Sequence, residues 1–454
     1  MRHIVIIGNG IAGVTTAREL RKGSDDRITV ISSETDHHYS RTALMYIYMG
    51  HMTYAHTKPY EDWFWAKNRI DLVRAHVSHI DFDQKILTLQ ATGTPENMLM
   101  YDVLVLAVGS LPNRPGILHT DLRGVQGLYG IPDLEQMEAL TDPKSGTPVS
   151  RAVVIGGGLI GIELCEMLLS RHIPVSFLVR EDSFWRTVLP AEESAMITRH
   201  IRAHHVDLHL ETEVTELHDD GTGRIGGVTT KASQRLDCQF AGVSVGVSAN
   251  IGWLRDSGLE TDRGILVDRY LKTNLPDVYA IGDCVQHRTP PPGRRPTEQI
   301  WYTGRIMGEI LAKTLLGTPT PYQPGVFFNS AKFFDIEYQT YGDVPANLPD
   351  DGSLHTFYWE HPGGERAIRI NHTTDGAVTG VNAFNIRQRQ DVWTQWITDK
   401  RPVQYVLEHL PQANFDPEFF RQHEADILAA YNAQNPGATV RLRAKKGLFG
   451  LFSG

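Results

Sequence analysis

The chain places short apolar runs before stretches in which apolar residues recur at helical spacing, and it does so twice in the same order. Near its beginning, "HIVIIG" predicts a buried strand and "IAGVTTARELRK" predicts the helix that follows. "RITVIS" supplies a second strand and completes a strand–helix–strand unit of about thirty residues. The order recurs in "AVVIGG", "LIGIELCEMLLSRH" and "PVSFLVR", between residues 152 and 180. Two such units predict an α/β protein with two Rossmann-like domains.

Other segments predict how these domains are connected. The strand-like segments "YDVLVLAVGSLPNRPG" and "GVSVGVSANIGWL" have the glycines and prolines of crossings between domains. From about residue 325 the pattern changes to alternating strands plus "DVWTQWITD", which predicts a smaller α+β domain. We therefore expect a first domain over 1–117 and 246–324, a second one inserted at 118–245, a third over 325–440, and a tail over 441–454.

Glycines with the spacing G-x-G-x-x-G occupy the turn between strand and helix in both units. The first glycine allows the tight bend, the second lets the backbone approach a pyrophosphate, and the third lets the helix pack on the strand. The helix N-terminus then offers free N–H groups to the phosphates. Either motif alone is also compatible with a plain glycine-rich turn, but the strand–turn–helix–strand context favours two dinucleotides. The candidate residues are Gly8, Gly10, Ala12 and Gly13, and Gly156, Gly158 and Gly161.

The end of each second strand predicts which dinucleotide is bound. Ser33 and Glu34 follow the first unit, where a carboxylate can accept hydrogen bonds from a ribose. Arg180 follows the second unit, and Arg186 lies six residues further on. Because arginine suits a 2′-phosphate, we predict a slight preference for NADPH over NADH. The alternative is that Arg180 is a solvated surface residue and Glu181 accepts the ribose.

Composition excludes several classes of function. With 41% hydrophobic and 21% charged residues the chain is typical of soluble globular proteins, and no segment is apolar for long enough to span a membrane. The net charge of −9 argues against a nucleic-acid partner. Three cysteines without a close pair exclude a disulfide framework and indicate a reducing cytoplasm. The 20 histidines show no ligand pattern, so no metal is predicted and the pairs at 37–38 and 204–205 are expected at the surface.

With these blocks in place, the chain resembles the flavoprotein family with two dinucleotide-binding domains. This family includes the pyridine-nucleotide-disulfide reductases, the ferredoxin and rubredoxin reductases and the apoptosis-inducing-factor group. Over about residues 1–325, "GNGIAG" matches the FAD motif, "YDVLVLAVGSLP" a strand that contacts FAD, "GGGLIGIE" the NAD(P)H motif and "TNLPDVYAIGDC" the second FAD signature. The resemblance implies FAD and NAD(P)H as cofactors, with the NAD(P) domain inserted in the FAD domain. The third domain resembles that of ferredoxin reductases; the alternative is an unrelated dimerisation domain, and a homodimer is possible.

The resemblance also implies roles for individual residues. Asp283 matches the aspartate that binds the ribityl chain of FAD, and Arg41 and Glu163 match a pair near flavin N5 and the nicotinamide. The alternative for Arg41 is binding of an FAD phosphate, and for Glu163 an ordinary position on a helix surface. "TEQIW" opens a helix that would point its N-terminus at the flavin, with Trp301 as a core residue in the alternative reading. Further cofactor-binding candidates are Ala107, Gly109, Gly246, Gly282, Gln299 and Ile300.

The chain departs from the disulfide reductases at one informative place. "YSRTALMYIYMGHM" contains no cysteine where those enzymes carry the pair that relays electrons from the flavin, and Cys165 and Cys284 are expected to be packing residues. We therefore predict hydride transfer from NAD(P)H to FAD and then to an external acceptor such as a ferredoxin or rubredoxin. The alternatives are a membrane-peripheral quinone reductase, anchored weakly through "RAKKGLFGLF", and a redox-sensing flavoprotein with slow turnover.

Overall fold

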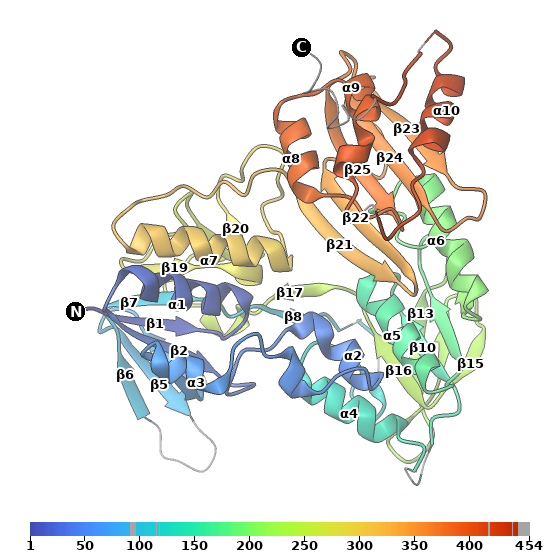
Figure 1. Cartoon of the computed structure of the whole chain (residues 1–454). Helices are drawn as coiled ribbons and strands as arrows, with labels where there is room; N and C mark the ends of the chain where they lie inside the picture. The colour runs from blue at the N-terminus through green and yellow to red at the C-terminus, as the bar shows by residue number, and fades with distance from the viewer. Residues whose placement is uncertain are drawn as a thin grey trace, which may run out of the picture. The chain divides into compact units, whose positions relative to one another are not determined.

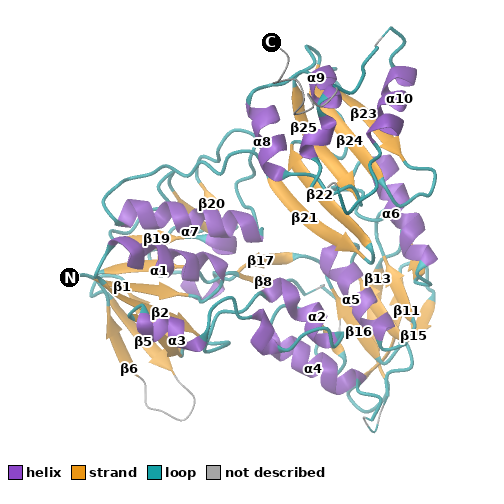
Figure 2. Cartoon of the chain, viewed as in Figure 1, coloured by secondary structure: helices purple, strands orange, loops and turns teal. Residues whose placement is uncertain are grey.

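The computed structural model describes residues 1–90, 97–114, 116–117, 119–144, 146, 148–415, 418–437 and 439–443. The chain forms two compact units. Unit 1 combines Met1–Arg180 with Thr212–Pro324, and unit 2 combines Glu181–Glu211 with Gly325–Gly454. Each contains helices and strands (Figure 2). The α/β class predicted from the sequence is confirmed, and the strands of both glycine-turn units lie in unit 1.

The first sheet of unit 1 contains both strands of the first glycine-turn unit. Its five parallel strands lie in the order β19 (Val278–Ala280), β7 (Val103–Leu106), β1 (His3–Ile7), β2 (Arg27–Ser32) and β3 (Ile70–Arg74). Helices α1 (Ile11–Gly23) and α7 (Trp301–Leu315) lie side by side against it (Figure 1). A Cβ atom at Gly308 would lie 2.6 Å from the carbonyl oxygen of Ala12, so glycine lets the two helix backbones approach closely.

The second parallel sheet of unit 1 contains the second glycine-turn unit. Its strands include, in spatial order, β11 (Val175–Leu178), β10 (Ala152–Ile155), β16 (Phe240–Val243) and β9 (Val125–Gln126). Helix α5 (Leu159–Ser170) follows β10, and helix α4 (Ile131–Thr141) follows β9. Val153 and Val154 on β10 have no exposed surface, which explains why this strand reads as an unbroken apolar run.

The two predicted crossings pair with each other. Strand β8 (Ser110–Pro112) leaves the first sheet and lies antiparallel to β17 (Val247–Ala249), which returns from the second. The amide of Asn113 donates to the carbonyl oxygen of Gly246 at 2.9 Å, and Gly246 has a φ of 91°, a conformation that favours glycine. Because β19 then completes the first sheet, the second sheet is an insertion in the first, as the sequence predicted.

Smaller elements complete unit 1. They are the sheet β4 (His76–Asp81), β5 (Ile86–Gln90) and β6 (Asn97–Met100), the sheet β13 (Val214–Asp219), β14 (Ile225–Thr230) and β15 (Arg235–Asp237), the pair β18 (Ile265–Val267) and β20 (Val285–His287), helices α2 (Leu44–Tyr48) and α3 (Asp62–Lys67), and 3-10 turns at Arg41–Ala43, Tyr54–Thr57, Gly252–Leu254 and Gly282–Cys284.

Unit 2 is built on one antiparallel sheet. Its strands lie in the order β21 (Phe328–Phe333), β22 (Ile336–Gly342), β25 (Val378–Phe384), β24 (Ala367–Thr373) and β23 (Leu354–Glu360). The unit also contains α6 (Ala191–Ala203), β12 (Asp207–His209), α8 (Gln390–Thr398), α9 (Val403–Glu408), the 3-10 turn Leu410–Ala413 and α10 (Glu424–Gln434). Trp393 on α8 is fully buried in the core of this unit. Strands and helices of an α+β domain begin near residue 325, as predicted.

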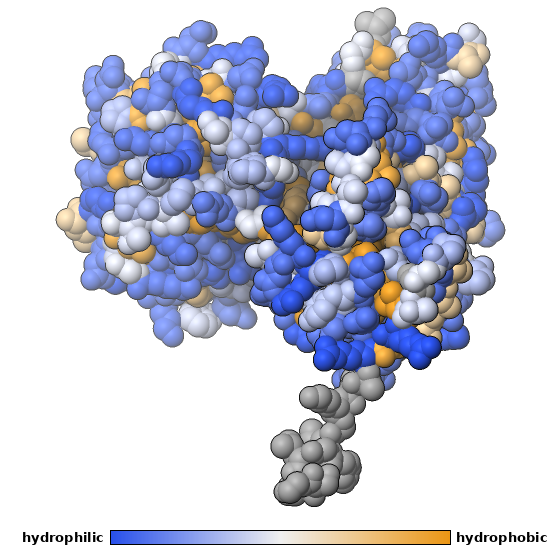
Figure 3. All heavy atoms as spheres, turned by 90° about the horizontal axis from the view of Figure 1, so that it is seen from above, coloured by the Kyte–Doolittle hydropathy of each residue, from blue (hydrophilic) through white to orange (hydrophobic). Residues whose placement is uncertain are grey.

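The described surface is largely polar. On the face shown in Figure 3, hydrophilic residues cover most of the molecule and apolar residues occur in small groups. Exposed apolar side chains include Trp63, Met98 and Phe419. Within the ranges given above, the chain forms no helix with the length and apolar character needed to cross a membrane. The predicted tail lies, from residue 444 onward, outside the described residues.

Candidate dinucleotide-binding sites

The first glycine turn lies between β1 and α1, and each of its glycines has a different task. Gly8 has a φ of 116°, and a Cβ atom there would lie 2.0 Å from the carbonyl oxygen of Ala107. A Cβ atom at Gly13 would lie 2.1 Å from the carbonyl oxygen of Gly8. A Cβ atom at Gly10, by contrast, would meet nothing within 4 Å. The fold itself therefore requires the outer two glycines, whereas the middle one keeps a space open.

The second glycine turn, between β10 and α5, repeats this arrangement. Gly156 has a φ of 111°, and its Cβ atom would lie 2.4 Å from the carbonyl oxygen of Ser244. A Cβ atom at Gly161 would lie 2.2 Å from the carbonyl oxygen of Gly156, while one at Gly158 would meet nothing within 4 Å. The two turns thus have the same arrangement of close contacts, and the open space lies over the middle glycine in each.

The helices that begin at these turns present unused hydrogen-bond donors. Gly10 and Gly158 are the N-cap residues of α1 and α5, neither helix has a side-chain cap, and neither has an acidic residue in its first turn. The first backbone N–H groups of a helix have no partner within it, and the helix dipole is positive at this end. Open space, free donors and positive potential fit the pyrophosphate of a dinucleotide at both turns.

The strand ends beside the two turns lie in matching register. The amide of Gly8 donates to the carbonyl oxygen of Ile31 at 2.8 Å, and the amide of Gly156 donates to that of Leu178 at 3.0 Å. Ser33 lies two residues after Ile31, and Arg180 lies two residues after Leu178. Arg180 therefore holds the position in the second unit that Ser33 holds in the first. Glu181 likewise corresponds to Glu34. Arg180 is exposed, so the two units offer different side chains at the position that distinguishes dinucleotides.

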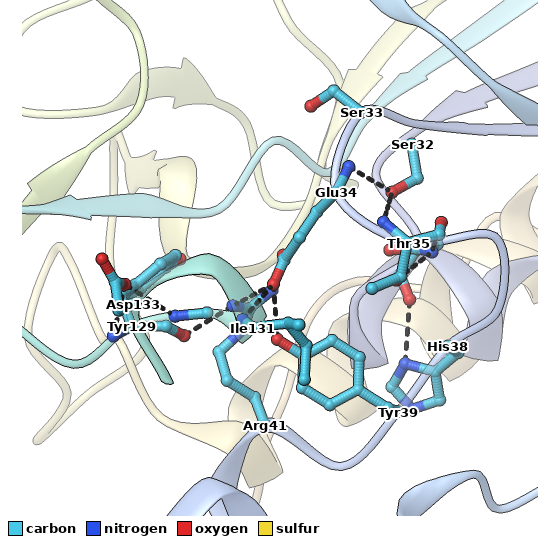
Figure 4. A network of polar contacts seen from close by, with 12 residues as sticks. Ser32, Ser33, Glu34, Thr35, His38, Tyr39, Arg41, Tyr129, Ile131 and Asp133 are labelled. Carbon is cyan, nitrogen blue, oxygen red and sulfur yellow. Dashed lines mark hydrogen bonds and ion pairs between the residues drawn. The ribbon is translucent and has the colours of Figure 1, made fainter. Parts of the chain in front are cut away.

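Glu34 is the centre of a polar network within unit 1 (Figure 4). Its carboxylate accepts hydrogen bonds from Arg41 Nη2 at 2.6 Å, from the Tyr39 hydroxyl at 2.5 Å and from the amide of Ile131 at 3.0 Å. Burial alone would raise the pKa of Glu34, but the hydrogen bonds and the charge of Arg41 lower it below its ordinary value. Glu34 thereby caps the N-terminus of α4 and ties this helix to the loop after β2.

Arg41 is held by the same network. Its Nη1 donates to the carbonyl oxygen of Tyr129 at 2.6 Å, and its guanidinium carbon lies 4.6 Å from the centre of the Tyr129 ring. The family resemblance implied an ion pair between Arg41 and Glu163, but in the structure Arg41 forms its ion pair with Glu34. The sequence-based hypothesis paired Arg41 with a residue far along the chain, whereas its partner in the structure, Glu34, lies only seven residues before it.

Glu163 lies on α5, two residues after the last glycine of the second turn. Burial, and to a lesser extent the nearby carboxylate of Glu166, raises the pKa of Glu163 to about 7. A carboxyl group with such a pKa changes charge near neutral pH, as acid–base groups in active sites do. Its predicted place at the nicotinamide remains a prediction.

The residues of the predicted flavin signature converge within unit 1. Ser110 Oγ donates to Asp283 Oδ2 at 3.1 Å, and burial raises the pKa of Asp283. Gly282, with a φ of 78°, would place a Cβ atom 3.1 Å from Cβ of Ala12, so this strand end meets the first glycine turn. Gly109 has a φ of 69°, and a Cβ atom there would lie 3.1 Å from the Tyr129 hydroxyl. The first glycine turn and the segment that contains Asp283, which are the two predicted flavin motifs, therefore lie close together.

Several other predicted residues lie elsewhere. Gln299 is exposed and Ile300 is the N-cap residue of α7, as the predicted helix start at this segment requires. Arg186 belongs to unit 2, where its Nη1 donates to the carbonyl oxygen of Ala346 at 3.1 Å and its Nη2 to Asn347 Oδ1 at 2.8 Å. The structure therefore gives Arg186 partners in the loop between β22 and β23.

Some histidines differ from the expectation of a surface position. His38 is buried and hydrogen-bonded through Nδ1 to the carbonyl oxygen of Asn9 at 2.8 Å, and burial lowers its pKa to about 4. The prediction for His38 was therefore wrong. Two adjacent histidines suggest a polar surface segment, but they do not reveal that His38 has a hydrogen-bond partner in the buried carbonyl oxygen of Asn9. His204, which was expected at the surface, is half-buried and lies close to His200 and Asp335.

A comparison with protein families agrees with this geometry. The model of the pyridine nucleotide-disulphide oxidoreductases matches residues 2–305, which contain both glycine turns and the Asp283 signature. The chain belongs to this family. It is an FAD-dependent NAD(P)H oxidoreductase, and the family resemblance inferred from the sequence is confirmed.

Individual relatives extend over different shares of this oxidoreductase. Nitrite reductase [NAD(P)H] of Bacillus subtilis is 28% identical over 98% of the chain, which spans 54%, about half, of that enzyme. The ferredoxin–NAD(+) reductase subunit of the benzene 1,2-dioxygenase system of Pseudomonas putida is 28% identical over 69% of the chain and 74% of its own length. Rubredoxin-NAD(+) reductase of Acinetobacter baylyi is 29% identical, covering 70% of the chain and 80% of the reductase.

Solved structures show the same fold. The NAD-dependent persulfide reductase from A. fulgidus superimposes with a TM-score of 0.81 at 20% identity, over 96% of this chain and 84% of that one. At this identity the match concerns the fold, and it extends over both units of the oxidoreductase.

Proposed function

We propose that this oxidoreductase passes electrons from NAD(P)H through FAD to a one-electron acceptor outside the chain, such as a ferredoxin or a rubredoxin. Two matched glycine turns with open space over Gly10 and Gly158 support this function, because they provide for both cofactors in one unit. All three cysteines are buried free thiols, so no thiol relay stands between flavin and acceptor. The relatives named as ferredoxin and rubredoxin reductases use acceptors of this kind.

The cofactors supply the chemistry when bound: C4 of NAD(P)H gives a hydride to N5 of FAD, which can release the two electrons singly. The protein positions and tunes these groups. Gly10 and Gly158 leave room for the two pyrophosphates, and the N-termini of α1 and α5 donate to them. Asp283, whose carboxylate accepts a hydrogen bond from Ser110, would hold the ribityl chain of FAD. Glu163 provides a carboxylate whose charge changes near neutral pH beside the nicotinamide.

The acceptor is identified by NAD(P)H oxidation against a panel of ferredoxin, rubredoxin, a quinone and oxygen. We expect ferredoxin or rubredoxin to be reduced well above the oxygen background. Reduction of quinone alone, dependent on anionic liposomes and lost without residues 441–454, would instead support the peripheral-membrane alternative. Turnover with none of the four would support the redox-sensing alternative.

Alanine variants of the two middle glycines test the cofactor sites separately. Gly10 (φ −69°, ψ 179°) and Gly158 (φ −100°, ψ −177°) have backbone conformations that alanine adopts, and their Cβ atoms would meet no protein atom. We expect Gly10→Ala to purify with little FAD. Gly158→Ala should keep FAD but raise the KM for NAD(P)H by at least about tenfold, because the added methyl group occupies the place of a pyrophosphate.

Thermal unfolding of the cofactor-free chains provides the control for these variants. Both should unfold at the wild-type temperature or slightly above it, since alanine at a compatible position lowers the entropy of the unfolded chain. Gly8→Ala, in contrast, should destabilise the fold, because its Cβ atom would collide with Ala107. Unchanged FAD content in Gly10→Ala and unchanged KM in Gly158→Ala would refute the proposed sites.

We further propose a preference for NADPH that depends on Arg180. Its exposed guanidinium stands in register with Ser33 of the first unit and suits a 2′-phosphate. Arg186 contributes less, because Asn347 and Ala346 already bind its guanidinium.

Stopped-flow reduction of the flavin in Arg180→Ala measures this preference. Loss of one charge-assisted contact should weaken NADPH binding by roughly tenfold to a hundredfold and leave NADH within about twofold of wild type. An equal effect on both nucleotides would show that Arg180 does not recognise the 2′-phosphate, and would favour Glu181 as the residue that meets the ribose.

A further inference from the structure

Two histidines and an aspartate meet at one point of unit 2. His200 lies in the last turn of α6, and His204, four residues later, is its C-cap residue, so the two rings lie one above the other on the same side. Asp335 lies in the tight turn between β21 and β22. Its Oδ1 is 2.6 Å from His200 Nε2 and 3.4 Å from His204 Nε2. One nitrogen of each ring and one carboxylate oxygen lie within 4.8 Å of one another.

Hydrogen bonding determines which nitrogen of His204 can bind a cation. Its Nδ1 is 3.0 Å from the carbonyl oxygen of His200, and a carbonyl oxygen only accepts, so Nδ1 carries a hydrogen. The Nε2 atom of the neutral ring then has a lone pair, directed at Asp335 Oδ1, which has lone pairs of its own. A proton or a metal ion on His204 Nε2 removes the repulsion between these lone pairs, and a bound metal ion would also replace the 2.6 Å hydrogen bond between His200 Nε2 and Asp335 Oδ1. An imidazole that donates its other N–H to a backbone carbonyl is the usual state of a metal-binding histidine.

The surrounding residues hold the three side chains in place. The ring of Phe334 stacks on that of His204, with centroids 4.2 Å apart and planes 13° apart. His200 is buried at 5% exposure, whereas the side chain of Asp335 is 68% exposed. A cation therefore has access from solvent to a group of ligands whose rings are fixed by packing. The carboxylate of Glu365 also lies near enough to His200 to act on it electrostatically.

We propose that His200, His204 and Asp335 form a binding site for a divalent transition-metal ion of the Zn²⁺ type. Two imidazole nitrogens with one carboxylate oxygen are ligands that Zn²⁺, Co²⁺ and Ni²⁺ accept, whereas Ca²⁺ and Mg²⁺ prefer oxygen ligands alone. Three protein ligands leave the fourth tetrahedral position for water. Since the ligands come from α6 and from the β21–β22 turn, the bound ion would fasten this helix to the sheet of unit 2.

Calorimetric titration of the FAD-loaded full chain with Zn²⁺, after chelator treatment and without a histidine tag, tests this site. We expect one ion to bind per chain, and the thermal unfolding temperature to rise with Zn²⁺ concentration because only the folded chain brings the ligands together. His204→Gln and Asp335→Asn should each lower the affinity by more than about tenfold. Titration with Mg²⁺ should give no comparable binding.

Two control variants distinguish this site from general binding to surface histidines. His209 Nε2 lies 3.0 Å from Asp207 Oδ2, and among the described residues this pair is not part of a group of three metal-ligating side chains. His205 is the exposed neighbour of His204. His209→Gln and His205→Asn should bind Zn²⁺ as the wild type does. The proposal fails if the wild type binds no Zn²⁺, or if His204→Gln and Asp335→Asn, with wild-type FAD content and circular dichroism, bind it unchanged.

Discussion

Glu163 connects the geometry of the second glycine turn with a measurable pH dependence. Burial raises its pKa to about 7, so the residue is largely neutral in mild acid and becomes a carboxylate as the pH rises through neutrality. In the function proposed above Glu163 lies beside the nicotinamide ring, which gains positive charge as it loses a hydride, and a carboxylate there would stabilise that charge. We therefore expect the rate of flavin reduction by NADPH to rise with an apparent pKa near 7. Glu163→Gln should remove this rise and stay at the low-pH rate.

Stopped-flow measurements from about pH 6 to about pH 9 separate this role from a structural one. Glu166→Gln, on the same helix, is the matched variant: it should keep the pH dependence and move its midpoint slightly lower, since Glu166 contributes to the raised pKa. Stability gives a second measurement. A carboxyl group whose pKa is raised on folding stabilises the fold below its unfolded pKa, and this contribution is lost as the pH rises through 7. Glu163→Gln should thus be more stable than wild type at alkaline pH, and a pH profile identical to wild type would refute the role.

At the scale of elements, the sequence predicted what depends on local pattern. The strands at 3–7 and 152–155 and the helices after the glycine turns follow from apolar runs and helical spacing, and they form as predicted. The first glycine of each turn was predictable for the same reason, because a tight turn with a positive φ admits few other residues. The link between Glu34 and α4 was not, since it joins residues 97 positions apart and depends on how the two sheets meet.

The segment Glu181–Glu211 is a second case in which contacts between distant residues, and not the local pattern, determine the structure. It was predicted within the domain over 118–245, but the structure groups it with Gly325–Gly454 in unit 2. Arg369 on β24 donates to Glu193 at 2.9 Å and to Glu192 at 2.7 Å, and Arg369 and Glu193 are both nearly inaccessible. Two acidic residues in the first turn of α6 read locally as helix-dipole partners. Their buried partner lies 176 residues from Glu193, and no local pattern reveals it.

At the scale of the whole molecule, the route by which electrons leave follows from where the thiols lie. Burial raises the pKa values of Cys238 and Cys284 to about 12 and holds that of Cys165 well above its ordinary value. Only thiolates react rapidly with disulfides, so none of the three is suited to relay electrons. We expect a chromogenic disulfide reagent to find no rapidly reacting thiol in the native protein and three after denaturation. Prolonged alkylation of the native protein should leave NADPH-dependent reduction of the acceptor unchanged. Inactivation in step with the modification of a single cysteine would instead place a thiol on the electron path and overturn direct transfer from the flavin.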